Sequence, residues 1–331
     1  MSISKSFNKQ KIKLLIKLCI AASAIYFLFN SGSLDFYSIV IVFDYPHLFF
    51  LSLVCLFLGI CLSGIRWWVL LGVTENNISI RTVLSIQLMG SFFSSWLPGA
   101  AGGDAIKGVL LFKLLDSRRS TALASIAIDR LFAVFGLFSI ALCASLFLSE
   151  SDSKNDVLDF YFDVLSWGAI AGVLLVFFAM VLFWSVRRFS LHALLPIAIR
   201  SYLSPIGQIV NYYKKACLRL LVSSVLSMLA SGVVIVGIVI ISMMYDYAAS
   251  PAVTAIAGVI GNVSSVIPIT PGGIGVGEAV FAKISSDFSG SFAPFATIYF
   301  TFRIGMLVAN IPGMIISFAY SNTRHRELNN R

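Results

Sequence analysis

LPGAAGGDAIKGVLL, the stretch from Leu97 to Leu111, interrupts a chain dominated by long apolar runs. It holds four glycines, a proline, an aspartate and a lysine. Backbone polar groups at membrane depth are tolerated only where they are buried in protein or face a wet cavity. Glycine permits tight turns and the close approach of another group. The stretch therefore predicts a break in the backbone within a membrane, with charge placed beside it.

The composition around this stretch is that of a polytopic helical membrane protein. The chain has 331 residues, of which 58% are hydrophobic and 12% charged, and its mean hydropathy is +0.92. Several apolar runs reach the roughly 20 residues that a helix needs to cross a bilayer core. We therefore expect an all-α, polytopic integral membrane protein with a single membrane domain, residues 1–331.

The net charge of +9 does not indicate nucleic acid, because Lys and Arg cluster at the ends of apolar runs and in the loops between them. That distribution reports orientation in the membrane. The five cysteines form no CxxC pair, and the three histidines are far apart in sequence. The sequence therefore predicts no metal site and no cofactor.

The hydropathy pattern predicts six full spans, near 14–30, 48–71, 121–148, 164–185, 220–245 and 292–318. Two shorter pairs flank two breaks: 79–96 with 104–115, and 251–269 with 276–286. The basic tails, the 113–119 cluster and a predicted amphipathic segment at 186–219 favour the cytoplasmic side. Six spans satisfy this only if each short pair is a re-entrant helical hairpin. Eight to ten spans are the alternative, if the short helices cross.

This orientation places both termini in the cytoplasm of a cell with the chain in its inner or plasma membrane. The acidic or neutral loops 31–47, 149–163 and 246–250 then face outside. The first half consists of two spans, a hairpin and a third span, and it starts on the cytoplasmic side. The second half has the same order of segments but starts on the outer side. The chain is thus predicted to contain two inverted repeats, residues 14–148 and 164–318.

Three landmarks support the repeat by their spacing. Pro98 and Pro271 are 173 residues apart, and Arg130 and Arg303 have the same separation. The acids of the two breaks, at positions 104 and 278, are 174 apart. Inverted repeats with paired Gly/Pro-interrupted segments are typical of secondary transporters, in which those segments form the substrate site.

The two breaks therefore predict a substrate-binding site without catalytic residues. A helix N-terminus attracts anions such as phosphate, and a charge at membrane depth usually marks a pathway with a partner nearby. We expect Arg130 to pair with Asp104 and Arg303 with Glu278, although pairing between the halves is equally allowed. Lys107 contacts a phosphate or only pairs with Asp104. The predicted binding residues are Pro98, Gly99, Gly102, Gly103, Asp104, Lys107, Arg130, Pro271, Gly272, Gly273, Gly275, Glu278 and Arg303.

The polar residues also have purely structural interpretations that involve no substrate. Both acids are alternatively caps of the helices that they begin, and Arg130, with the aspartate before it, alternatively lies at the membrane interface. Arg66, in the segment Arg-Trp-Trp at the end of an apolar run, is interpreted as an interfacial anchor. Asn262 and Asn310 are expected to bridge helices.

The chain resembles the lysylphosphatidylglycerol synthase transmembrane-region family, also called flippase-like. LPGAAGGDAIKGVLL is similar to that family's block of Pro-Gly, Gly-Gly-Asp and a basic residue, and IPITPGGIGVGEAVF to its second block. Asp129-Arg130 is similar to the family's usual Glu-Arg. The basic residue that often precedes the Glu of the second block is Gly277 here. The resemblance covers nearly the whole chain.

The resemblance implies a membrane domain that moves phospholipids or lipid-linked molecules between leaflets. The best-known members flip aminoacylated phosphatidylglycerol and carry a soluble aminoacyl-transferase domain, which we do not expect here because the chain ends soon after its last span. The leading hypothesis is a lipid transporter or flippase for an anionic or lipid-linked substrate, not an enzyme. The alternatives are a membrane-embedded lipid-modifying transferase and a non-catalytic partner of an envelope-lipid assembly. A separate lipid-modifying enzyme is a possible partner, and the oligomeric state is not predicted.

Overall fold

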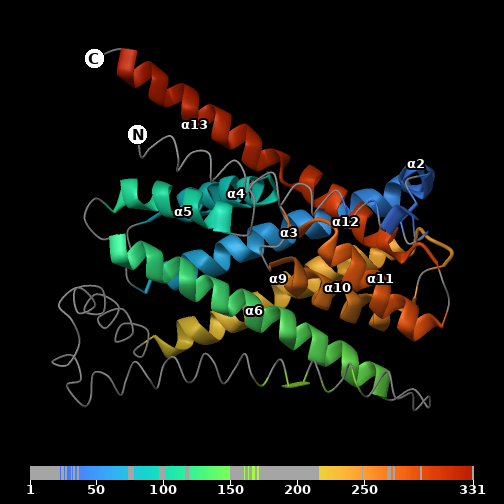
Figure 1. The fold of residues 1–331 in the computed structure, drawn as a ribbon. Coiled ribbons are helices and arrows are strands. Elements are labelled where there is room, and N and C mark those ends of the chain that lie inside the picture. Colours follow the sequence, from blue (N-terminus) through green and yellow to red (C-terminus); the bar gives the residue numbers. More distant parts are fainter. Residues whose placement is uncertain are drawn as a thin grey trace, which may run out of the picture.

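The computed structural model describes residues 37–73, 78–96, 101–115, 119–149, 216–247, 249–266, 273–290 and 293–329, with isolated positions elsewhere. Within these residues the chain is helical and contains no strand, as expected. Figure 1 shows long helices lying side by side, with shorter ones packed against them. The elements are η1 (Tyr37–Val40), α2 (Ile41–Asp44), α3 (Pro46–Leu71), α4 (Ile80–Trp96), α5 (Ala101–Leu114), α6 (Arg119–Ser149), α9 (Cys217–Ser242), α10 (Pro251–Val266), α11 (Val276–Ser289), α12 (Phe295–Ala309) and α13 (Ile311–Asn329).

Four stretches of the described chain are long and apolar enough to cross a membrane: Pro46–Leu71, Leu123–Ala144, Cys217–Ser242 and Phe295–Tyr320. They coincide with four of the six predicted spans. The predicted spans near 14–30 and 164–185 and the predicted segment 186–219 lie almost wholly outside the described residues. The protein is therefore a multi-pass helical membrane protein, and its number of spans stays a prediction.

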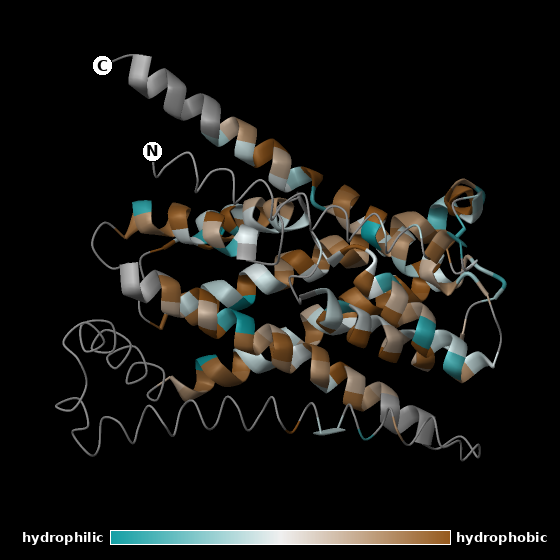
Figure 2. Ribbon diagram, in the orientation of Figure 1, coloured by the Kyte–Doolittle hydropathy of each residue, from teal (hydrophilic) through white to brown (hydrophobic). Residues whose placement is uncertain are grey.

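The long helices are apolar on their outward faces. Phe50, Leu58, Leu221, Leu229 and Phe318 are all exposed, each on a helix of the candidate spans. Hydrophobic residues cover most of the ribbon in Figure 2, and hydrophilic residues occur in patches between the helices and at their ends. Large side chains facing outward suit hydrocarbon, in which they lose nothing by being exposed. The surface chemistry thus agrees with a membrane setting.

Small residues bring the long helices close together. Ser223, Ser227 and Ser231 form a buried stripe at four-residue intervals on α9, which packs against α3 and α6. A Cβ on Gly237 of α9 would lie 2.9 Å from Leu56 Cδ2 of α3. Close approach through Gly and Ser is the common way of packing helices in lipid, where no hydrophobic effect drives them together.

The two breaks each join a pair of packed helices. α4 packs against α5, and α10 packs against α11. Figure 1 places these pairs toward opposite ends of the bundle. The sequence predicted the first short helix to begin at residue 104, but α5 begins at Ala101, so Gly102 and Gly103 lie in its first turn. A Cβ on Gly103 would collide with the Gly90 carbonyl and Ser94 Oγ of α4, so glycine there permits the contact between the two helices.

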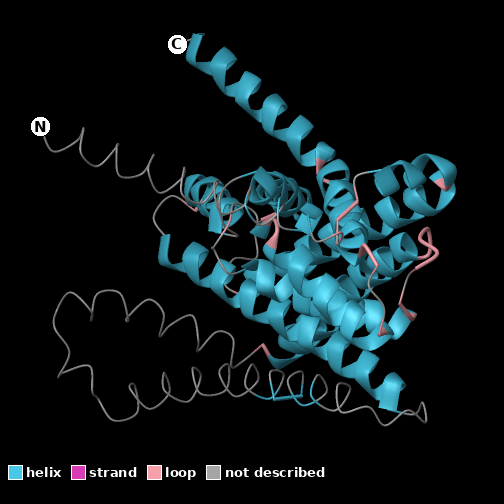
Figure 3. Cartoon of the chain, turned by 45° about the vertical axis from the view of Figure 1, so that its right-hand side comes forward, coloured by secondary structure: helices cyan, strands magenta, loops and turns pink. Residues whose placement is uncertain are grey.

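The last predicted span is interrupted. α12 ends at Ala309, Asn310 forms a turn, and α13 continues to Asn329, well beyond the expected end at 318. Pro312 follows the turn, and proline is tolerated in the first turn of a helix but not in its interior. Figure 3 shows α13 projecting away from the bundle beyond this turn. The predicted span near 292–318 is therefore present as the candidate span Phe295–Tyr320, with a turn at Asn310 that the hydropathy did not indicate.

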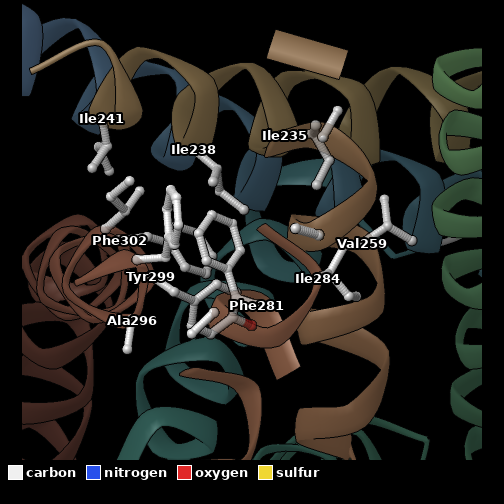
Figure 4. Close-up of a cluster of buried hydrophobic side chains, with 14 of the residues drawn as sticks. Ile235, Ile238, Ile241, Val259, Phe281, Ile284, Ala296, Tyr299 and Phe302 are labelled. Atoms are coloured by element: carbon white, nitrogen blue, oxygen red, sulfur yellow. The ribbon is translucent and has the colours of Figure 1, made fainter. Parts of the chain in front are cut away.

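The largest apolar core lies where α9, α10, α11 and α12 meet. Figure 4 shows Ile235 and Ile238 of α9 facing Phe281 of α11 and Tyr299 and Phe302 of α12. The rings of Phe281 and Tyr299 pack in a tilted arrangement with their centroids 5.4 Å apart, and those of Tyr299 and Phe302 with theirs 5.2 Å apart. This aromatic packing supports the helices that carry the second break.

Candidate functional site

The first break is followed by a two-point ion pair between α5 and α6. Asp104 lies in the first turn of α5. Arg130 donates from Nε to Asp104 Oδ2 over 2.6 Å and from Nη2 to Oδ1 over 2.7 Å. The Arg130 side chain is 42% exposed and the Asp104 side chain 21%. The expected pairing within the first half is therefore present, and both groups can be approached from outside the protein.

Lys107 lies one turn after Asp104 but points elsewhere. It is buried, and its Nζ lies over the ring of Trp67 in α3, 5.2 Å from the centroid. A Cβ on Gly90 of α4 would lie 2.7 Å from Lys107 Cγ. The aliphatic part of Lys107 therefore packs against α4 at Gly90, where any larger residue would collide with it. The cation–π contact with Trp67 replaces part of the hydration that the ammonium group loses on burial.

The second break carries the matching acid–arginine pair. Glu278 lies in the first turn of α11 and is almost fully buried, and its Oε1 is 2.6 Å from Nε of Arg303 in α12. The Gly275 N–H donates to Glu278 Oε2 over 2.7 Å, which closes the start of the helix. Glu278 is thus both a helix cap and an ion-pair partner, so the two interpretations of this residue hold together.

Arg303 also holds the loop of the second break. Its Nη2 donates to Ser265 Oγ in α10 and to the Gly273 carbonyl, both over 2.8 Å. Gly273 and Gly275 have φ of 69° and 87°, a region that suits glycine. The arginine therefore connects both sides of the break, and the backbone conformation that receives it depends on glycine.

Tyr299 packs beside Arg303, one helical turn earlier. The guanidinium carbon is 5.4 Å from the centre of the tyrosine ring, and the Tyr299 hydroxyl donates to Asn262 Oδ1 over 3.0 Å. Asn262 therefore bridges α10 and α12, as predicted. A Cβ on Gly277 would lie 2.9 Å from Arg303 Nη2 and 2.8 Å from Tyr299 Cε1. The basic residue common in the family at this position would not fit this arrangement.

A third ion pair was missed from the sequence. Arg66 donates from Nε to Asp129 Oδ1 over 2.9 Å, with the two side chains only 4% and 5% exposed, and its Nη1 is 3.4 Å from Ser227 Oγ. Arg66 was expected at the membrane interface, and that interpretation is wrong. The overlooked signal is that five apolar residues follow Arg66 in α3, which places it more than a turn inside the helix.

The last turns of α4 and α10, which precede the two breaks, contact the turn after α12 and α12 itself, respectively. Asn310 donates from Nδ2 to Ser95 Oγ, one residue before the end of α4, over 3.2 Å. Arg303 binds Ser265 and Gly273 on the two sides of the second break. Seven residues of helix span about 10 Å at 1.5 Å per residue. The ends of the two helix pairs therefore meet the same helix about 10 Å apart, and Asn310 bridges helices as predicted.

Four of the predicted binding residues, Pro98, Gly99, Pro271 and Gly272, lie outside the described residues. The rest fall into two groups. Gly102, Gly103, Asp104, Lys107 and Arg130 lie on α5 and α6, and Gly273, Gly275, Glu278 and Arg303 lie around the second break and on α12. Each described acid of the two breaks pairs with the arginine of its own half, Asp104 with Arg130 and Glu278 with Arg303.

The fold and these ion pairs define a multi-pass α-helical membrane domain that carries charged groups between its helices. The chain belongs to a family described as the lysylphosphatidylglycerol synthase TM region, whose sequence model matches residues 14–317. That family consists of membrane domains with lipid-related, flippase-like function. A comparison with curated proteins gave no match.

Proposed function

We propose that this protein is a lipid transporter that moves an anionic or lipid-linked substrate between the leaflets of a cell membrane. The observation that carries the proposal is the presence of two acid–arginine pairs, each between the first turn of a short helix that follows a glycine-rich break and the next long helix. Ionisable groups inside membrane segments are costly and usually lie on substrate or ion pathways.

The depths of the two arginines favour a path between leaflets. Arg130 lies seven residues into the candidate span Leu123–Ala144, and Arg303 eight residues into Phe295–Tyr320. Each arginine is therefore about 10–12 Å from the start of its span, at 1.5 Å per residue. If the two spans run in opposite directions, as the inverted repeat predicts, the arginines lie at different depths in a core about 30 Å thick. The two guanidinium groups then offer two successive binding positions for one lipid headgroup.

The geometry also supports a way of passing the headgroup along. A phosphate oxygen is a good partner for a guanidinium, because both form short charge-assisted hydrogen bonds. A phosphate that approaches Arg130 replaces one bond to Asp104 and leaves the other, so no charge is stripped of all its partners. Arg303 offers a second guanidinium, released by movement of the loop at Gly273. Rocking of one half against the other alternately exposes the binding positions at Arg130 and Arg303.

The experiment is lipid exchange in liposomes that contain the purified protein. A fluorescent phospholipid is placed in both leaflets, and the fraction that an impermeant quencher can reach is followed over time. We expect wild-type protein to expose the inner-leaflet pool, and Asp104→Ala and Arg303→Ala to abolish exchange. Lys283→Ala is the matched control, because it removes an ion pair to Asp287 whose lysine side chain is 73% exposed.

The variants must also insert normally, which is checked by their yield and by their elution on size exclusion. Exchange at the wild-type rate in both alanine variants would refute the assignment of the site. A change in the mass of the added lipid, measured on the same samples, would instead indicate a lipid-modifying transferase. Absence of exchange by wild-type protein with every anionic and lipid-linked substrate tried would refute transport.

A further inference from the structure

The acid–arginine pair of the second break is more enclosed than that of the first. The Glu278 side chain is 1% exposed and that of Arg303 19%. The corresponding values at the first break are 21% for Asp104 and 42% for Arg130, so water can compensate a change of charge there. Water has little access to the carboxylate of Glu278, and a buried charge without an opposite partner is costly. The second pair must therefore stay neutral overall when a ligand binds.

The surroundings of Glu278 fit an ionised carboxylate. Its Oε1 is 2.6 Å from Arg303 Nε, and its Oε2 accepts from the Gly275 N–H over 2.7 Å. A carboxylate accepts at both oxygens, whereas a protonated carboxyl group uses one oxygen as a donor. In the structure without substrate, one negative carboxylate is therefore balanced by one positive guanidinium.

The other described groups around Glu278 do not offer a charge that could balance a further anion. Its helix, α11, packs against α10 and α12. No side chain of α10 is titratable, and those of α12 are Tyr299 and Arg303. On α11 itself, Lys283 pairs with Asp287 over 2.6 Å and is 73% exposed. Tyrosine and arginine ordinarily keep their protons at neutral pH, so the carboxylate of Glu278 is the group that can change its charge.

A phosphate that binds Arg303 places two anions against one enclosed cation. The carboxylate removes the excess negative charge when it takes up a proton from the aqueous phase, and its O–H can then donate to a phosphate oxygen. We propose that Glu278 binds one proton each time Arg303 binds the anionic group of a substrate, and releases it when the substrate leaves. This inference rests on the proposed function and deepens it, since it makes the transporter a proton co-transporter.

The charge of this site is the same before and after binding. Without substrate, the carboxylate and the guanidinium cancel. With a singly charged phosphate bound, the guanidinium cancels the phosphate and the carboxyl group is neutral. Proton and substrate occupy the site together, so they cross the membrane in the same direction and carry no net charge. A pH gradient therefore drives lipid exchange, and a membrane potential does not.

The test is a calorimetric titration of short-chain phosphatidylglycerol into purified protein in detergent, which does not depend on transport. The titration is repeated in two buffers with different heats of ionisation, and the difference gives the number of protons taken up. We expect about one proton per bound lipid, so that the affinity rises about tenfold for each pH unit by which the pH is lowered.

Glu278→Gln carries no charge but keeps an oxygen for the Gly275 N–H, so the start of α11 is retained. In this variant we expect the proton uptake to disappear and the affinity to be the same at every pH. Asp287→Asn is the matched control, because it removes an acid of the same helix that pairs with the exposed Lys283. It keeps the wild-type uptake and the wild-type dependence on pH.

The inference is overturned if wild-type protein binds the lipid without proton uptake, if Glu278→Gln takes up as many protons as wild type, or if no lipid binds at any pH. Exchange of fluorescent phosphatidylglycerol in liposomes separates the two proposals. Exchange that is equal with and without a pH gradient supports transport and refutes coupling. Proton uptake on binding without any leaflet exchange supports the site at Glu278 and refutes transport.

Discussion

Arg66→Met tests whether the interior ion pair between α3 and α6 holds a charge that must stay compensated. The substitution retains an unbranched side chain of similar length but removes the guanidinium, so Asp129 is left 5% exposed without its partner. Removal of one partner from a buried pair costs about 3–5 kcal/mol. At 1.4 kcal/mol per factor of ten, the folded state loses about a hundredfold to a few thousandfold in population relative to the unfolded one.

The second member of the series is Arg66→Met with Asp129→Leu. This double variant removes the abandoned carboxylate and leaves an apolar contact between the same two helices. Replacement of a buried ion pair by well-packed apolar residues is often neutral or stabilising. We therefore expect its free energy of unfolding to return to about the wild-type value, about 3 kcal/mol or more above that of the Arg66→Met single variant.

The assay is reversible unfolding in mixed micelles, titrated with a denaturing detergent and followed by tryptophan fluorescence. Arg81→Met is the control, because Arg81 is exposed on α4 and its loss is expected to change stability by about 0.5 kcal/mol or less. The reasoning is refuted if the single variant at Arg66 is as stable as wild type. It is equally refuted if the double variant is no more stable than the single one.

Two further predictions concern the second break and the loop before α3. Gly277→Ala places a methyl group 2.9 Å from Arg303 Nη2, so lipid exchange falls together with thermal stability. The control Gly108→Ala, whose nearest neighbour is 3.8 Å away, leaves both unchanged. A second measurement is an NMR titration of Asp35, whose carboxylate accepts from the Ser38 hydroxyl over 2.6 Å, a bond that lowers its pKa below the ordinary 3.8. A lowered folded-state pKa stabilises the loop above pH 3.8 and loses that effect as the pH falls through the folded value. Ser38→Ala raises the pKa toward 3.8, and an unchanged titration midpoint would contradict this account.

The positions of the four described spans were predictable because apolar runs of that length have few other uses. The pairs at Asp104 and Glu278 were predictable for a different reason. A charge beside a glycine-rich break needs a partner, and the matched spacing of Arg130 and Arg303 named one for each. Local pattern and repeat spacing together were enough, without any information on distances.

The pair of Arg66 with Asp129 was not predictable in the same way. Its members are 63 residues apart and lie on helices whose rotation about their axes the hydropathy does not specify. Arg66 next to two tryptophans is typical of a membrane interface, and that local pattern outweighed the five apolar residues that follow. The turn at Asn310 was also missed, although Pro312 marks it, because the apolar run continues through it.

The seat of α13 on α4 bears on how the chain is made. Gly313, near the start of α13, lies so close to the Leu88 carbonyl of α4 that a Cβ would collide with it, and Asn310 donates to Ser95 of the same helix. Because α13 follows α4 by more than 200 residues, the ribosome synthesises α13 long after the helix against which it packs. Until α13 is synthesised, the face of α4 at Leu88 and Ser95 lacks these contacts, and a chain truncated before α13 never gains them. The packing around α4 can therefore be completed only after α13 has been synthesised.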